Sequence, residues 1–153
     1  MSNNNPLKQF FRQPALYLRL PTQGKWYTTS DVETINDGEL SVFGLTAIDE
    51  IMLNTPDAML NGQALEKVLN NCAPGFKNIK KIMLPDLEAL FLAIKVATSD
   101  EAYEITRECP NCNHENNFNV DCQHLLDTMS FIDENDTQVI FNDELIVLSL
   151  IHI

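Results

Sequence analysis

Cys109 and Cys112, separated by two residues, form the local motif whose residue types and spacing point most directly to a chemistry. Two thiolates at this spacing, carried at the tip of a β-hairpin, can both face one metal ion, as in a zinc knuckle. Asn113 follows at the position where a knuckle needs a left-handed residue, usually glycine, and asparagine is the next best choice. The sequence CPNC therefore predicts a zinc-knuckle-like turn.

A structural zinc site needs four ligands, and the chain has no second pair of cysteines at this spacing. Cys72 and His114 are the better candidates for the missing ligands, because a regular strand would carry Cys122 and His124 about 20 Å from the tip. Two alternatives stay open, a knuckle without metal and redox use of the thiols. Redox use is less favoured, since a redox pair usually begins a helix and here a strand is expected. The candidate ligands of one structural zinc are Cys109, Cys112, Cys72 and His114.

The other polar residues have simpler structural interpretations. His152 lies on an expected strand near the end of the sequence, and the charges at residues 133–136 suit a solvated turn. Asp49 and Glu50 are adjacent carboxylates, but a capping role is available to the first and the helix surface to the second. No nucleophile, base and orienting group can be recognised together, so we expect that the protein is not an enzyme.

The elements around the cysteines predict an α+β fold, with a small antiparallel sheet, a few packed helices and a zinc-knuckle-like β-hairpin. Alternating apolar residues and turn signals predict strands at residues 15–20, 25–29, 32–35, 39–43, 103–108, 118–120, 137–141 and 144–153. Helical spacing predicts helices at residues 64–72, 84–98 and 125–129. We expect a basic N-terminal arm at 1–14 and a single α+β domain at 15–153, with the CPNC hairpin at about 103–120 and C-terminal strands at about 137–153.

The helix expected at residues 84–98 should form the centre of the core. We expect Leu87, Leu90, Phe91 and Ile94 to share its buried face. If that face is buried, replacing Phe91 by alanine should cost about 3 to 5 kcal/mol.

The sequence of residues 46–62 predicts two short capped helical turns in succession, which we call the helical step, and not a catalytic motif. Thr46 and Asp49 have the spacing of a capping box, in which each side chain accepts from the other's backbone. Thr55 followed by Pro56 repeats a helix start, and Gly62 ends the step.

Charge is distributed unevenly over the 153 residues, whose formal net charge is −12. All 22 acidic residues lie after residue 25, so an acidic body carries a basic arm. This balance argues against sequence-independent binding of nucleic acid. The arm could bind an acidic neighbour or fold back on its own domain. No apolar run approaches the ~18 residues of a membrane span, and the first residues lack the apolar stretch of a secretory signal, so we expect a cytosolic protein.

Several segments follow one another in a recognisable order. They are FFRQPALYLRLPTQGKWY, GEL-x-V, TAIDEIMLNTPDAMLNG, NNCAPGF, LPDLEALFLAIKVAT and CPNC. This ordered set resembles the baseplate hub proteins of T-even-type contractile-tailed bacteriophages, over much of the first 125 residues.

The resemblance implies a structural or assembly component of the baseplate hub that acts through protein–protein contacts. The implied partners are other hub or tail-initiation proteins, with the tape-measure protein as a further candidate, and the protein could be an oligomer in the baseplate. The implied location is the virion tail baseplate, reached after assembly in the host cytoplasm. Two alternatives stay open: a transient tail-assembly chaperone absent from the mature virion, and a zinc-knuckle adaptor protein.

The basic arm and the step at residues 56–62 are the contact regions that we expect. The candidate partner-binding residues are Phe10, Phe11, Arg12, Met59 and Leu60. For Met59 and Leu60 the alternative, that they fill the core, stays open.

Overall fold

The computed structural model describes residues 12–34, 38–56, 62–99, 101–133, 138–141 and 144–147, the last two ranges by their backbone alone. The expected α+β class is confirmed. Helices are α1 (Ala47–Leu53), α3 (Gln63–Cys72), the short 3-10 helix η2 (Ile79–Lys81), α4 (Leu84–Thr98) and α5 (Cys122–Asp127). Strands are β1 (Leu16–Arg19), β2 (Glu39–Val42), β3 (Tyr103–Glu108), β4 (Glu115–Val120), β5 (Gln138–Phe141) and β6 (Glu144–Val147). Within these ranges the strands form three separate antiparallel pairs, β1 with β2, β3 with β4 and β5 with β6.

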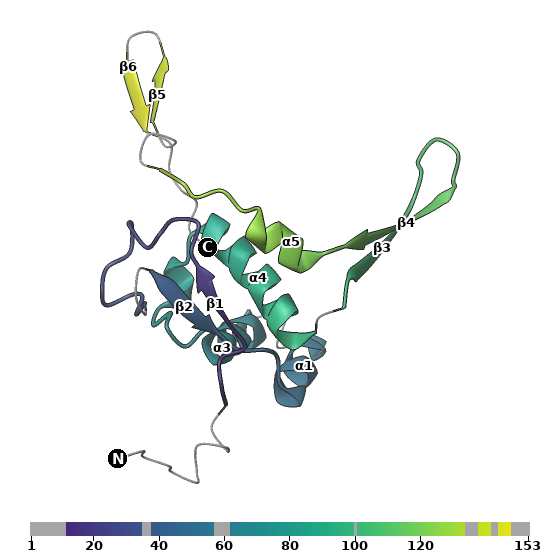
Figure 1. Ribbon diagram of the computed structural model, residues 1–153, viewed down its shortest axis with the longest axis horizontal. Coiled ribbons are helices and arrows are strands. Elements are labelled where there is room, and N and C mark those ends of the chain that lie inside the picture. The colour runs from purple at the N-terminus through teal and green to yellow at the C-terminus, as the bar shows by residue number, and fades with distance from the viewer. Residues whose placement is uncertain are drawn as a thin grey trace.

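The helix α4 runs through the middle of the molecule, with the β1–β2 pair beside it and α5 packed against it (Figure 1). Its limits agree with the predicted helix at residues 84–98, because Pro85 suits a first turn, where its missing N–H leaves no hydrogen bond unmade. The core between these elements is made of fully buried side chains from the sheet, the helices and the connection before α4. The largest are Leu20, Leu40, Leu69, Phe76, Ile82 and Leu90. Each such side chain contributes roughly 1.5 to 3 kcal/mol by leaving water.

The burial of α4 differs from the expectation at one residue. Leu87, Leu90 and Ile94 are buried as predicted, whereas Phe91 is 42% exposed. Two small residues of the helix, Ala89 and Ala93, are also fully buried, and β1, β2 and α5 pack against the helix. Because Phe91 is not buried, the large loss of stability that was expected for Phe91→Ala does not apply.

Residues 25–29 were expected to be extended, and this prediction is wrong, because the structure has consecutive turns there. The turns allow the Tyr27 hydroxyl to donate to Asp86 Oδ2 at 2.6 Å and to accept from the Met83 backbone at 2.9 Å. Thr22 donates to the same carboxylate from its backbone and its hydroxyl. Asp86 is fully buried, and burial raises its pKa above the ordinary value although these donors oppose the shift. The loop is thereby tied to the first turn of α4.

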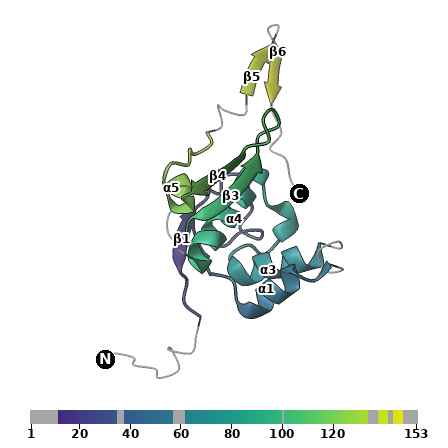
Figure 2. The same ribbon diagram turned by 90° about the vertical axis from the view of Figure 1, so that its right-hand side faces the viewer.

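The last third of the described chain consists of two hairpins joined by α5. That helix begins at Cys122, earlier than expected, because Asp121 caps it by accepting from the His124 backbone at 3.0 Å. In Figure 1 both hairpins project from the helical body, and Figure 2 shows β5 and β6 clear of it. The expected strand at residues 144–153 is present as β6, and its residues 148–153 lie outside the described residues. None of the described helices is long and apolar enough to cross a membrane.

Candidate functional site

The turn between β3 and β4 carries Cys109 and Cys112 at the tip of the hairpin. The Cys109 backbone N–H donates to the His114 carbonyl at 2.8 Å, and the Asn113 N–H donates to the Cys109 carbonyl at 2.8 Å. Asn113 has φ = 54°, the left-handed conformation that the sequence predicts for it. The backbone of the turn therefore has the expected knuckle shape.

Backbone dipoles of the turn converge on one of the two sulfurs. The pKa of Cys109 is lowered chiefly by the N–H of Asn111, and further by the N–H and the thiol of Cys112, all donating to its Sγ. Such donors stabilise a thiolate, which is the form that binds metal and acts as a nucleophile. Cys112 is exposed and Cys109 partly so, which leaves both sulfurs open to a ligand from solvent.

The other two candidate ligands lie elsewhere. Cys72 is fully buried at the end of α3, where its Sγ lies 3.9 Å from the Gly44 carbonyl and burial raises its pKa. His114 is an exposed residue of the hairpin turn. Over the described ranges, no three His, Cys, Asp or Glu side chains come together in a way that could hold a metal ion. The structure brings Cys109 and Cys112 together but does not add Cys72 and His114 to them.

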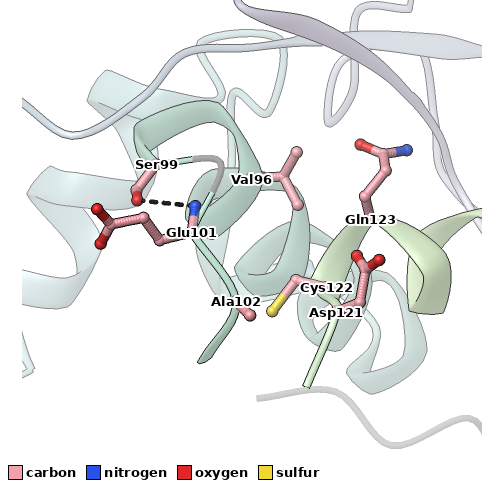
Figure 3. A pocket seen from close by; sticks show the side chains of 7 residues that line it. All are labelled: Val96, Ser99, Glu101, Ala102, Asp121, Cys122 and Gln123. Atoms are coloured by element: carbon pink, nitrogen blue, oxygen red, sulfur yellow. Dashed lines mark hydrogen bonds between the residues drawn. The ribbon is translucent and has the colours of Figure 1, made fainter. Parts of the chain in front are cut away.

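Cys122, the fourth cysteine, is buried at the start of α5 and lines a cavity of about 380 Å³. Figure 3 shows this cavity between the end of α4 and the start of α5, with the Cys122 sulfur directed towards Ala102. On the α4 side the Glu101 N–H donates to Ser99 Oγ at 3.2 Å. The cavity thus has one thiol, Cys122, and two carboxylates, Glu101 and Asp121, in its wall.

A second cavity, of about 550 Å³, lies between α3, η2 and the start of α4. Its walls are mainly apolar, with Leu65, Leu69 and Ile79 among them, and a Lys80–Glu66 ion pair of 3.7 Å lies at its side. Its chemistry suits an apolar group.

Arg12, a candidate contact residue of the basic arm that the structure describes, binds its own chain. Its guanidinium donates to the Asn71 carbonyl at 3.0 Å and to the Gly44 carbonyl. It also lies 5.2 Å from the centre of the Phe43 ring, in the geometry of a cation–π contact. The arm was expected either to bind an acidic neighbour or to fold back on its own domain, and the contacts of Arg12 agree with folding back. The other candidate contact residues, Phe10, Phe11, Met59 and Leu60, lie outside the described residues.

The helix α1 has the predicted capping box, with Thr46 and Asp49 accepting from each other's backbone N–H groups. Asp49 also accepts from Asn71 Nδ2 at 2.8 Å, which connects α1 to α3. Burial raises the pKa of Asp49, but these hydrogen bonds and the Arg12 charge outweigh it, so the pKa lies below its ordinary value.

Because Asp49 faces inwards, the opposite side of α1 faces solvent. Ile48 and Ile51 lie on that side and are 69% and 67% exposed, the most exposed large apolar side chains over the described ranges. We call this pair the α1 ridge. Sequence spacing does not indicate this exposed pair, because Ile48, Ile51 and Met52 also fit one helical face. Met52 and Leu53 lie on the side of Asp49 at helical spacing and Ile48 and Ile51 do not, but the burial of Asp49 depends on Asn71, 22 residues away.

The α1 ridge is held rigidly on the body. The Leu45 N–H donates to Thr98 Oγ1 at 2.8 Å, and the Phe43 N–H donates to the Cys72 carbonyl at 2.8 Å. Between them Gly44 lies so close to the Ala97 carbonyl that a side-chain carbon would collide with it. The chain entering α1 is thus fixed to the ends of α3 and α4.

Comparison with known protein families gives a match over most of the chain. Residues 43–148 match the family described as T4 bacteriophage base plate protein. No curated protein and no solved structure matches the chain significantly. The matched residues include α1 and both projecting hairpins, and they exclude the basic arm.

Proposed function

The chain belongs to the T4 bacteriophage base plate protein family, and from this premise we propose that it acts at the central hub of a contractile-tail baseplate. The family makes it a phage baseplate protein, with other phage tail proteins as its partners and the virion tail as its location. Our proposal adds that it is a structural or assembly component of the hub, that it works through protein–protein contacts and not through catalysis, and that it is built into tails in the host cytoplasm.

The carboxylates with shifted pKa values support a role without catalysis, because each of them ties parts of the fold together. Asp49 joins α1 to α3, and Asp86 of α4 binds Thr22 in the loop that follows β1. Asp31 has a lowered pKa because Thr28 donates to it and Lys81 of η2 pairs with it at 2.9 Å. Shifted pKa values often mark active sites, but structural networks produce them as well.

The observation that carries the proposal is the family match, and the α1 ridge is the surface that we assign to the contacts. Ile48 and Ile51 are apolar, exposed and rigidly mounted, which are the properties of residues that bury against a partner. They lie inside the matched segment, whereas the arm at residues 1–14 lies outside it. Phe10, Phe11, Met59 and Leu60 remain secondary candidates, and we assign Arg12 to holding the arm against the body.

The test replaces the ridge in the phage and asks whether tails still contain the protein. Ile48→Asp with Ile51→Asp should leave the isolated protein folded, because both side chains are exposed. Mass spectrometry of purified tails should then find the variant at least tenfold less abundant than the native chain. Glu50→Gln, on the exposed surface of the same helix, is the matched control and should be incorporated normally.

Two outcomes would contradict the proposal. Normal incorporation and infectivity of the double variant would remove the ridge from the contact surface. If native tails contain no peptides of the chain although tail assembly depends on it, the protein is a transient assembly chaperone and not a hub component.

A further inference from the structure

The hairpin tip has half of the ligands that a structural zinc site needs. Cys109 and Cys112 lie in a turn that is closed by hydrogen bonds from the Cys109 N–H to the His114 carbonyl and from the Asn113 N–H to the Cys109 carbonyl, with Asn113 left-handed, which is the backbone geometry of a metal-binding knuckle. Holding two thiolates in place before the metal arrives lowers the entropy cost of binding. Zinc prefers four ligands in a tetrahedron, so two are missing.

The described part of the chain does not supply the missing pair. Cys72 and Cys122 are buried in the helical body, and no third metal-binding side chain joins the two thiols. In Figure 1 the β3–β4 hairpin projects away from that body. Ligands from outside the chain can therefore reach the tip without meeting the helices.

From this placement we propose that Cys109 and Cys112 form one half of a zinc site, and that the same two cysteines of a second copy form the other half. A second copy supplies the two missing thiolates in the same preorganised geometry, which gives a four-cysteine site on a two-fold axis. On binding, each of the four thiols loses its proton to water and its sulfur forms one bond to the zinc ion. This zinc site does not depend on whether the protein acts at the baseplate hub.

The residues around the tip allow the hairpin tips of two copies to meet, and they determine how zinc and salt affect the pairing. Pro110, Asn111 and Asn113 are uncharged, so two tips can meet through neutral side chains. Glu108 and Glu115 face each other across the strands just below the turn, where like charges repel. Two metal-free copies should therefore stay apart, and pairing should require zinc and become stronger as salt screens the carboxylates.

The experiment uses the full chain under reducing conditions, with zinc and cobalt ions as the probes. Native mass spectrometry and analytical ultracentrifugation should show a monomer without metal, and a dimer holding one zinc for two chains when zinc is added. Cobalt should give the thiolate-to-metal charge-transfer band and the intense visible absorption of a tetrahedral four-sulfur site.

Substitutions distinguish the two cysteines at the tip from the other cysteines of the chain. Cys109→Ser and Cys112→Ser should each abolish the zinc-dependent dimer, whereas Cys122→Ala should keep it. Glu108→Gln should strengthen the dimer severalfold by removing the repulsion. One zinc per monomer, no zinc binding at all, or a dimer that survives Cys109→Ser would each overturn the proposal.

Discussion

Asp49 shows how one side chain can fix the orientation of a helix. It is fully buried, and it accepts from the Thr46 backbone at 2.8 Å and from Asn71 at 2.8 Å. These bonds hold one side of α1 against α3, which leaves Ile48 and Ile51 on the other side in solvent. The exposed α1 ridge is thus a consequence of a polar contact on the opposite face.

At this scale we predict that Asp49→Asn lowers the free energy of unfolding by about 1 to 2 kcal/mol at neutral pH, through loss of the cap and of the charge-assisted bonds. The pKa of Asp49 is lowered in the folded protein. Its carboxylate therefore contributes stability at pH values above its unfolded pKa, near 4, and this contribution is lost as the pH falls through the folded pKa. Urea denaturation at pH 7 and at about pH 3 should show a smaller acid-induced loss for the variant than for the native chain.

Glu50→Gln is the control for that measurement, because Glu50 lies in the same helix turn and is exposed. It should change neither the stability at neutral pH nor its acid dependence by more than about 0.5 kcal/mol. An equal loss of stability in acid for the native chain and Asp49→Asn would refute the role given to this carboxylate.

Residues whose roles depend on near neighbours were predictable from the sequence. The Thr46–Asp49 capping box and the left-handed Asn113 follow from spacing over a few residues, and both are present. The Asn71 partner of Asp49 lies 22 residues away, and no local pattern indicates it. The side of α1 that faces solvent depends on that partner, which is why the ridge was not foreseen.

At the scale of elements, α4 was predicted with its correct limits and with its buried residues Leu87, Leu90 and Ile94, but Phe91 was wrongly placed on the buried face. The helix is apolar on most of its circumference, so the spacing of its residues does not select one side. The selection comes from neighbours, since β1, β2 and α5 pack on it and leave Phe91 at the border. The turns at residues 25–29 have the same origin, because the hydrogen bond from Tyr27 to Asp86 spans 59 residues.

We predict a clear difference between two neighbouring residues of α4. Leu90→Ala should lower the free energy of unfolding by about 2 to 5 kcal/mol, because Leu90 is fully buried and its loss leaves a cavity. Phe91→Ala should cost less than about 2 kcal/mol, since 42% of Phe91 already contacts water. Urea denaturation of both variants measures the difference, and an equal cost would mean that Phe91 belongs to the core.

At the scale of the whole molecule, the β3–β4 hairpin is an appendage to the body. All six residues of β3 are exposed, and a two-stranded hairpin without a covered face is marginally stable by itself. The tip nevertheless has a well-defined knuckle geometry. Stability of the body and function of the hairpin should therefore be separable.

The final prediction tests that separation by shortening the hairpin. Tyr103 and Val120 face each other in the register, so an Asn-Gly turn can join β3 to β4 in place of residues 105–118. The free energy of unfolding should change by less than about 1 kcal/mol, because few side chains are uncovered and the loop entropy changes little. Amide hydrogen exchange should find α4 as protected as in the native chain, while the zinc-dependent dimer disappears together with Cys109 and Cys112. Loss of protection in α4 would show that the hairpin supports the body, since α5, which packs on α4, follows directly after it.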